Sequence, residues 1–227
     1  MIDAGHGFWG RFEWYKRFHA RLIATISERH SREVESWKRD LIEPLRGTVV
    51  EIGPGPGSNL RFLSPDVTWI GIEPNRHMEP YLRAEADRLG RPVRLEVGVA
   101  ERLPFADQSV DGVLGTLVLC TVRDVPAALA EVRRVLRPGG RFVFIEHVAA
   151  PRGTWARRVQ RLVRRPWGVA GDGCRPDRET WTAIEAAGFG SVELTHFRIP
   201  VPIAGPHIAG VAIEAGPRPM GPGARPP

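Results

Sequence analysis

The sequence predicts an α/β protein built on a mostly parallel, doubly wound sheet with helices on both faces. Two observations indicate this fold. Short β-branched runs alternate with longer amphipathic segments from residue 48 to residue 146, and a glycine-rich turn follows the first run. The repeated strand–helix–strand order favours parallel strands, because each crossover helix returns the chain to the edge where the previous strand began.

The chain before the first strand is predicted to be helical. Residues 11–39 carry apolar side chains three and four positions apart, which gives one apolar stripe on a helix. The stripe consists of Phe12, Tyr15, Phe18, Leu22, Ile23 and Ile26. Gly47 ends this region, and we assign residues 1–46 to an N-terminal helical extension.

Residues 47–214 are predicted to form one α/β domain. Strands are expected at residues 48–52, 67–72, 93–97, 110–114, 141–146, 192–197 and 208–213. Helices are expected to begin near Ser58 and to span residues 76–90, 125–136 and 178–187. Pro138-Gly139-Gly140 predicts a turn.

Three segments lie outside this alternation: the N-terminal extension, an insertion at residues 151–176 and the C-terminal tail. The arginine-rich part of the insertion, residues 154–165, predicts an amphipathic helix. Together, residues 1–39 and 154–170 are expected to form a lid over the acceptor pocket. Residues 215–227 are rich in proline and glycine and are predicted to be disordered.

Composition indicates a globular protein with a basic surface. The formal charge is +6 and nearly all the positive charge is arginine. Such a surface attracts nucleic acid, anionic lipid or an acidic substrate, but it is also typical of a solvated, arginine-biased exterior, and we favour the second interpretation. We therefore expect no nucleic-acid partner.

The two cysteines, Cys120 and Cys174, form no C-x-x-C pair and no metal-ligand spacing. We expect no metal, a reducing compartment and a cytoplasmic protein. No secretory signal and no apolar stretch of membrane-spanning length are recognised in the sequence.

The strongest local signal is Glu51-Ile52-Gly53-Pro54-Gly55-Pro56-Gly57, placed after a strand. Glycines here allow a tight turn and a close approach of a ligand to the main chain. The third glycine comes one residue earlier than in nicotinamide-binding loops, and no P-loop lysine follows. Glu73 ends the next strand, where a carboxylate can accept hydrogen bonds from both hydroxyls of a ribose.

A third element follows the third strand. Ala100 can offer its backbone and Leu103 an apolar surface to a nucleotide base, because the loop after this strand lies beside the base in such folds. Glu101 is interpreted either as part of this site or as a surface acid.

Together these motifs resemble the class I S-adenosylmethionine (SAM)-dependent methyltransferases of the type-11 subgroup, over about residues 40–150. Ile72-Glu73-Pro74-Asn75, Glu101-x-Leu103-Pro104-Phe105, Ser109-Val110-Asp111 and Leu136-Arg137-Pro138-Gly139-Gly140 complete the resemblance. It implies a Rossmann-like class I methyltransferase fold with about seven strands, the last antiparallel. Its implied SAM contacts are Glu51, Gly53, Gly55, Gly57, Asn59, Glu73, Pro74, Ala100, Glu101 and Leu117. Many relatives have an acid where this chain has Val99, so we expect adenine recognition through the backbone.

The acceptor half resembles the methyltransferase-like-seven proteins, which S-methylate hydrogen sulfide and small alkyl thiols. The matching segments are Thr116–Val122, Glu146–Ala149, Gly171–Cys174, Arg178–Trp181 and Gly205–Ile208. This chain departs from that family in lacking its hydrophobic N-terminal anchor, so stable membrane insertion is not expected.

The acceptor-side candidates are His147, Asp172 and His207, which we assign as catalytic. Either histidine can act as a general base near neutral pH, or can be a hydrogen-bonded structural residue. Cys120 and Cys174 are interpreted as small buried apolar residues, because direct methyl transfer needs no covalent enzyme intermediate.

We therefore expect a SAM-dependent methyltransferase with a small-molecule acceptor, preferably a thiol. The alternatives are O-, N- or C-methylation of a natural product, quinone or phospholipid. A nucleic-acid binder on a methyltransferase scaffold, using the basic helix, is a third.

Overall fold

A computed structural model describes residues 12–216 and contains one seven-stranded sheet. The strands are β1 (Thr48–Ile52), β2 (Thr68–Ile72), β3 (Arg94–Glu96), β4 (Val110–Thr116), β5 (Leu136–His147), β6 (Ser191–Arg198) and β7 (Pro206–Ile213). Their order across the sheet is β3-β2-β1-β4-β5-β7-β6. All neighbouring pairs are parallel except those that β7 makes with β5 and β6. The predicted doubly wound fold with one antiparallel strand is confirmed.

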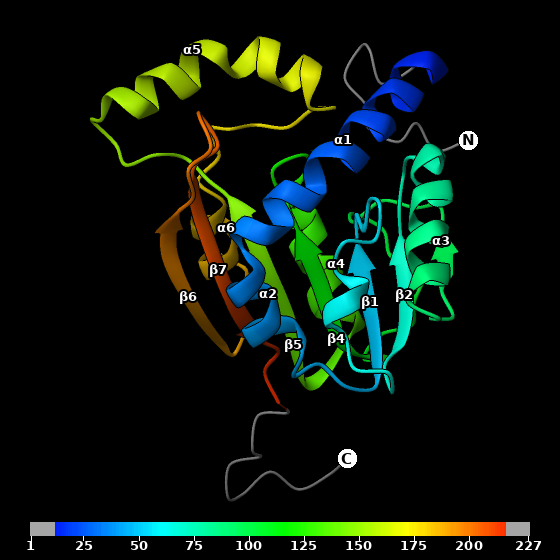
Figure 1. The fold of residues 1–227 in the computed structure, drawn as a ribbon. Coiled ribbons are helices and arrows are strands. Elements are labelled where there is room, and N and C mark those ends of the chain that lie inside the picture. Colours follow the sequence, from blue (N-terminus) through cyan, green and yellow to red (C-terminus); the bar gives the residue numbers. More distant parts are fainter. Residues whose placement is uncertain (1–11, 217–227) are drawn as a thin grey trace, which may run out of the picture.

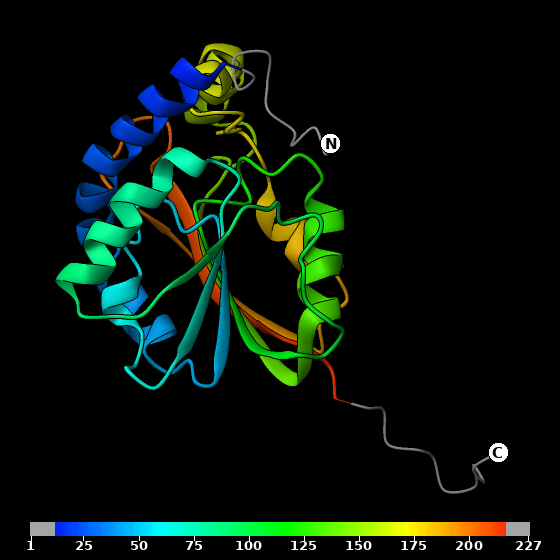
Figure 2. The ribbon, with the colours of Figure 1, turned by 90° about the vertical axis from the view of Figure 1, so that its right-hand side faces the viewer.

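Helices cover both faces of the sheet (Figures 1 and 2). They are α1 (Glu13–Glu33), α2 (Glu35–Ile42), η2 (Leu60–Phe62), η3 (Arg76–Met78), α3 (Glu79–Arg88), α4 (Val125–Val135), α5 (Trp155–Ala170) and α6 (Thr180–Ala186). Figure 2 shows α1 and α3 on one side and α4 and α6 on the other. No helix among the described residues is long and apolar enough to cross a bilayer.

Each face of the sheet has its own apolar core. On one face α4 and α6 bury Leu129, Val132 and Ile184 against the sheet, and on the other α2 and α3 bury Ile42 and Leu82. Central strands of a parallel sheet are covered on both faces, which is why most residues of β1 and β4 are buried.

The carboxyl ends of β1, β2, β4 and β5 meet at one edge of the sheet, below α1 and α5 (Figure 1). Tyr15 of α1 donates a hydrogen bond to the Val169 carbonyl near the end of α5. The carbonyl of the next residue, Lys16, accepts a hydrogen bond from Asn75 Nδ2 at 3.1 Å. These contacts tie α1 both to α5 and to the turn after β2, so the helices lie over the edge where α/β proteins bind ligands.

Three expectations about elements were wrong. No regular helix begins near Ser58. Only the short turn Leu60–Phe62 forms there, and Pro65 would limit any extension of it, because proline disfavours helical backbone at Ser64. Residues 138–140 are not a separate turn but belong to β5, which accommodates Gly139 at φ +77° beside a register shift between Val110 and Gly112. The single helix expected over 11–39 breaks at Val34 into α1 and α2.

The apolar stripe on the first helix also has an unexpected orientation. Phe18 is 59% exposed and Ile26 is 50% exposed, whereas Tyr15, His19 and Ala20 are buried. On α5, Trp155 and Leu162 are likewise exposed. The predicted disordered tail falls mainly on residues 217–227, and the predicted N-terminal extension begins with residues 1–11; both of these stretches lie outside the described residues.

Candidate active site

The glycine loop turns sharply at the carboxyl end of β1. Gly53, Gly55 and Gly57 all have left-handed backbone, with φ of +60°, +54° and +85°. The Gly53 N–H donates to the Ile72 carbonyl at 2.9 Å, which joins the loop to β2. A Cβ on Gly55 would meet nothing within 4 Å, so open space lies in front of this residue. The loop therefore presents main chain to that space, as a ligand cradle requires.

Glu73 faces the same loop from the end of β2. One carboxylate oxygen accepts the Gly55 N–H at 3.0 Å and the other accepts the Asn75 N–H at 2.9 Å. Burial raises the pKa of Glu73 to about 7, against the lowering effect of these two hydrogen bonds. Each oxygen keeps a second lone pair, so the carboxylate can still accept hydrogen bonds from a diol.

Glu51 and Asn59 lie behind the loop. The Glu51 carboxylate is fully buried and accepts from Asn59 Nδ2 at 2.7 Å and from Trp69 Nε1 at 2.8 Å. Asn59 Nδ2 also donates to Thr116 Oγ1 at 2.8 Å. Burial raises the pKa of Glu51, while its two hydrogen bonds lower it. This network holds the glycine loop against β2 and β4, and it leaves Asn59 Oδ1 buried without a partner.

The remaining predicted cofactor residues lie around the loop. Pro74 follows Glu73, and Ala100 and Leu103 are buried in the turn after β3. Glu101 accepts the Arg123 N–H at 3.0 Å, so it supports the chain that leads into α4. Leu117 follows β4 in left-handed backbone, at φ +55°, a conformation that costs about 1–3 kcal/mol for such a residue and is often found at functional sites.

Glu146, which the sequence interpretation did not single out, organises the loop after β4. It lies at the end of β5, fully buried, and its carboxylate accepts the N–H groups of Val118 at 2.8 Å, Leu119 at 2.9 Å and Cys120 at 3.4 Å. Burial raises the pKa of Glu146 to about 7, and the backbone hydrogen bonds oppose this. The signal that could have found it is an acid at the end of an otherwise apolar strand.

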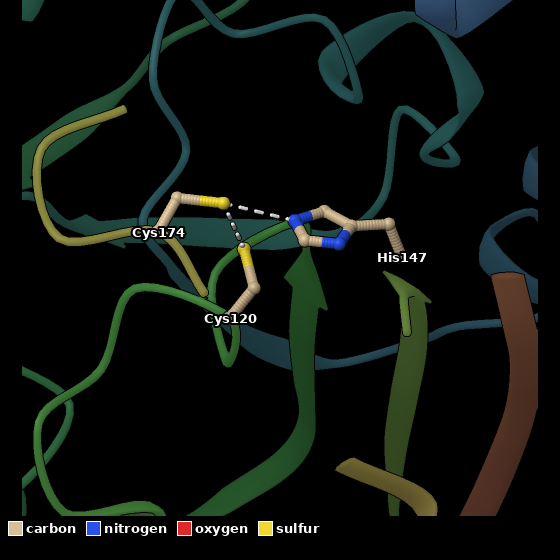
Figure 3. Close-up of side chains that lie close together, drawn as sticks. All are labelled: Cys120, His147 and Cys174. Carbon is tan, nitrogen blue, oxygen red and sulfur yellow. Dashed lines mark hydrogen bonds between the residues drawn. The ribbon is translucent and has the colours of Figure 1, made fainter. Parts of the chain in front are cut away.

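Next to Glu146, His147 meets two cysteines from distant parts of the chain (Figure 3). His147 Nε2 lies 3.0 Å from Cys174 Sγ, and the Cys120 and Cys174 sulfurs are 3.7 Å apart. Trp167 Nε1 donates to Cys174 Sγ at 3.2 Å. All three members of this Cys120–His147–Cys174 cluster are buried.

The electrostatics of the cluster favour a charged sulfur. The hydrogen bond between Cys120 and Cys174 lowers the pKa of Cys174 to about 4. Burial opposes this, and His147 and Trp167 lower the pKa further. Burial lowers the pKa of His147, but the charge on Cys174 and its hydrogen bond outweigh burial and raise that pKa overall. Cys174 is thus more than the small apolar residue that its sequence context suggested.

His207, the second predicted base, has both ring nitrogens engaged. Its Nδ1–H donates to the Gly205 carbonyl at 3.0 Å, so its Nε2 accepts from His30 Nε2 at 3.0 Å. Burial lowers the pKa of His207 to about 4 and that of His30 to about 3. This neutral pair lies opposite His147 in the β5–β7 register and leaves His207 without a free lone pair for a substrate.

Asp172, the third predicted catalytic residue, lies on the turn after α5 with left-handed backbone, at φ +48°. Its N–H donates to the Tyr15 hydroxyl at 3.1 Å, while its Oδ1 is buried without a partner. His19 of α1, which the sequence interpretation missed, also has a buried unpartnered atom, Nδ1, and its pKa is lowered by burial. Unpartnered polar atoms in a buried region are the groups that a polar ligand satisfies.

A separate hollow of about 630 Å³ lies at the other end of the sheet, beside Pro138 and Glu214. The Arg133–Glu214 ion pair, at 2.8 Å, lines it. It contains none of the predicted site residues, and the geometry described above favours the carboxyl edge instead.

The chain is similar in sequence to known methyltransferases. The methyltransferase-domain family matches residues 50–144. The chain is 37% identical to human thiol S-methyltransferase TMT1B over 88% of its own length and 87% of that protein. It is 34% identical to human thiol S-methyltransferase TMT1A over 91% of each chain.

Solved structures show the same fold. The YcgJ protein of Bacillus subtilis superposes with a TM-score of 0.65 at 21% identity, covering 83% of this chain and all of that one. A SAM-dependent methyltransferase of Thermotoga maritima, described as a possible histamine N-methyltransferase, gives 0.66 at 23% identity over 92% of this chain and all of that one. The fold, the glycine loop and the long match to two curated enzymes agree: this chain is a SAM-dependent methyltransferase of class I, belonging to the family that includes the thiol S-methyltransferases.

Proposed function

We propose that this enzyme transfers the methyl group of SAM to the sulfur of a small thiol. The observation that carries the proposal is the 37% identity to human thiol S-methyltransferase TMT1B across 88% of the chain. That match includes the acceptor side of the fold, where β4, β5 and the turn after α5 converge on the cluster of Figure 3.

The residues at the sheet edge fit SAM as the methyl donor. Gly55 borders open space, and Glu73 keeps a free lone pair on each oxygen for the ribose hydroxyls. The buried Asn59 Oδ1 lacks a partner close behind the loop. We assign the ribose to Glu73, the adenine to Ala100 and Leu103, and the acceptor side of the site to the chain after Leu117.

SAM, when bound, supplies a methyl group on a positively charged sulfur. The contribution of this chain is to align the acceptor behind that methyl and to exclude water. A thiol has a pKa of about 8.5, so a fraction is already thiolate at neutral pH and little base catalysis is needed. This suits a site in which His207 has no free nitrogen.

The experiment offers hydrogen sulfide, an alkyl thiol and a phenol of matched size to the purified enzyme in parallel, with labelled SAM. Methylation of at least one thiol, with the phenol inert, supports the proposal. Methylation of the phenol with both thiols inert would refute the proposal and show that the enzyme is an O-methyltransferase.

A cytoplasmic location belongs to the same proposal. Cys120 and Cys174 are free and buried 3.7 Å apart, which suits a reducing compartment. Fractionation of the source cells tests it, and recovery of the enzyme in a membrane or secreted fraction would contradict it.

A further inference from the structure

We propose that Cys120, His147 and Cys174 bind a single zinc ion. One sulfur, one imidazole nitrogen and a second sulfur all lie within 4.8 Å of one another, and they converge from the loop after β4, the end of β5 and the turn after α5 (Figure 3). Nothing in the methyl-transfer reaction itself requires these three side chains to meet.

Two of the three distances between the ligand atoms can be compared with those of a zinc site, and the third is at most 4.8 Å. With Zn–S bonds of about 2.3 Å in a tetrahedron, two sulfur ligands lie about 3.8 Å apart, and the two sulfurs here are 3.7 Å apart. The distance between His147 Nε2 and Cys174 Sγ is 3.0 Å and has to lengthen by about half an ångström to admit the metal. Cys174 lies on a turn flanked by Gly171 and Gly173, which allows this small shift.

The donor types select the metal. Two sulfurs and an imidazole are soft and borderline ligands, which suit Zn²⁺ and exclude Mg²⁺ and Ca²⁺. Two thiolates also cancel the charge of a divalent ion, so the loaded site is neutral. Neutrality matters because Cys120, His147 and Cys174 are only 2%, 5% and 8% exposed.

The site offers three protein ligands. Among residues 12–216 no fourth cysteine, histidine or carboxylate joins the group. Structural zinc sites use four protein ligands, whereas a site with three leaves one position for a water molecule or a substrate. Resting on the function proposed above, we infer that this fourth position takes the sulfur of the acceptor thiol.

Neighbouring groups already hold the Cys174 sulfur and the Cys120 backbone in place. Trp167 Nε1 donates to Cys174 Sγ, and the Glu146 carboxylate accepts the Cys120 N–H. Outer contacts of this kind orient the ligands of metal sites. His147 Nδ1 has no partner, so we expect the cysteines to contribute more of the zinc affinity than the histidine.

The test measures metal content on the full chain, purified under reducing conditions from zinc-supplemented medium and desalted after brief chelation. We expect about one zinc per chain in the wild type and at least about tenfold less in C120A and C174A. His207→Ala is the matched control, because His207 is a buried neighbour of His147 outside the cluster, and it should retain the zinc. S-adenosylhomocysteine (SAH) binding shows which variants are folded.

If a variant does not fold, replacement of zinc by cobalt in the wild type provides a second test, because the absorption spectrum of Co²⁺ reports its ligands. Thiolate ligands give Co²⁺ an intense sulfur-to-metal charge-transfer band in the near ultraviolet, and we expect this band with two thiolates per metal. Metal-free wild type whose thiols are confirmed reduced, or cysteine variants that keep their zinc, would overturn the proposal. A mass lower by two hydrogens, showing a Cys120–Cys174 disulfide in the reduced preparation, would do the same.

Metal content and thiol methylation are measured separately, so the two proposals fail in different ways. Zinc binding by an enzyme that methylates only the phenol would refute the proposed acceptor and the role of the fourth position, and leave the metal site standing. Equal thiol methylation by loaded and zinc-free enzyme would refute the role of the fourth position alone.

Discussion

In the proposed SAM site, Glu73 is the residue that we expect to contact the cofactor most directly. Glu73→Ala should weaken SAM and SAH binding by about tenfold to a hundredfold, because losing a charged hydrogen-bond partner costs about 1.5–3 kcal/mol. Calorimetry on folded protein measures the change. Glu79→Ala is the control, since Glu79 is an exposed acid paired with Arg83 and should leave affinity unchanged. Equal affinities for wild type and Glu73→Ala would remove the ribose assignment.

The raised pKa of Glu73 should make cofactor binding depend on pH, if Glu73 holds the ribose as proposed. Only the ionised carboxylate accepts hydrogen bonds fully, and its pKa is about 7 because of burial, with Asp172 and Glu51 as the acids that also raise it. SAH affinity should therefore increase as pH rises through 7, by about tenfold between pH 6 and pH 8. Calorimetry at several pH values measures this, and Glu73→Gln should flatten the profile. A wild-type profile that is flat would mean that Glu73 is ionised throughout.

The raised pKa of Glu73 affects the free energy of unfolding in the direction opposite to its effect on cofactor affinity. A carboxyl whose folded pKa is above its unfolded value of 4.5 costs stability when it is ionised. The ligand-free enzyme therefore gains stability from this group as pH falls through 7, while cofactor affinity falls over the same window.

Residue by residue, the sequence indicated the contacts around the glycine loop better than those at the ends of β4, β5 and α5. Gly53, Gly55 and Glu73 lie at fixed positions relative to consecutive strands, so spacing alone brings them together. The Cys120–His147–Cys174 cluster joins residues 27 and 54 positions apart through a loop and an insertion, and no local spacing encodes that meeting. His19 escaped notice because the first helix was expected to bury its apolar stripe, whereas it buries the face that carries this histidine.

At the scale of elements, the glycine loop makes a prediction with an internal control. Gly55→Val should abolish SAM binding while the chain still folds, because the side chain would enter the open space in front of the loop. Gly90 has similar backbone, with φ of +62° against +54°, and also faces open space, but it lies at the end of α3. Gly90→Val should therefore cost similar stability and keep full binding. Thermal melts and calorimetry compare the two; normal binding by Gly55→Val would make the loop only a structural turn.

Helices α1 and α5 are expected to act as a lid, as the sequence predicted. SAH and acceptor should slow hydrogen exchange in Glu13–Glu33 and Trp155–Ala170, with little change in the edge strand Ser191–Arg198. Tyr15→Phe removes the hydroxyl that joins Val169 to Asp172 and should accelerate exchange in both helices. Exchange that is the same with and without ligands would count against a lid.

The sequence placed most strands within about two residues, because apolar β-branched runs bounded by glycine or proline are a strong local signal. It failed where tertiary contacts override local preference. Asn59 is fixed by Glu51 and Thr116, so the chain after the glycine loop does not continue into a regular helix. Gly139 and Gly140 exchange backbone hydrogen bonds with Glu214 at 3.0 and 2.9 Å, which keeps an apparent turn inside β5.

At the scale of the whole molecule, the basic surface should not make the enzyme a nucleic-acid binder. Arg152 and Arg157 both pair with Glu179, and Arg164 pairs with Asp177 at 3.8 Å, so part of the α5 charge is neutralised. We expect no retention of duplex DNA or single-stranded RNA at about 150 mM salt, where purely electrostatic binding is weak. A salt titration by fluorescence anisotropy measures this. Tight binding that persists at that salt would revive the nucleic-acid hypothesis.

The two halves of the ligand edge come from separate stretches of chain. Gly53, Gly55 and Glu73 lie in the turns after β1 and β2. In contrast, Cys120 follows β4, His147 ends β5 and Cys174 follows α5. Gln160 of α5 connects the insertion to the rest of the domain. Its Nε2 donates hydrogen bonds to the Val148 and Ile203 carbonyls, and its Oε1 accepts the Ala150 N–H. Replacement of the segment from α5 to α6 would therefore change the cluster at Cys174 and leave Gly53, Gly55 and Glu73 in place.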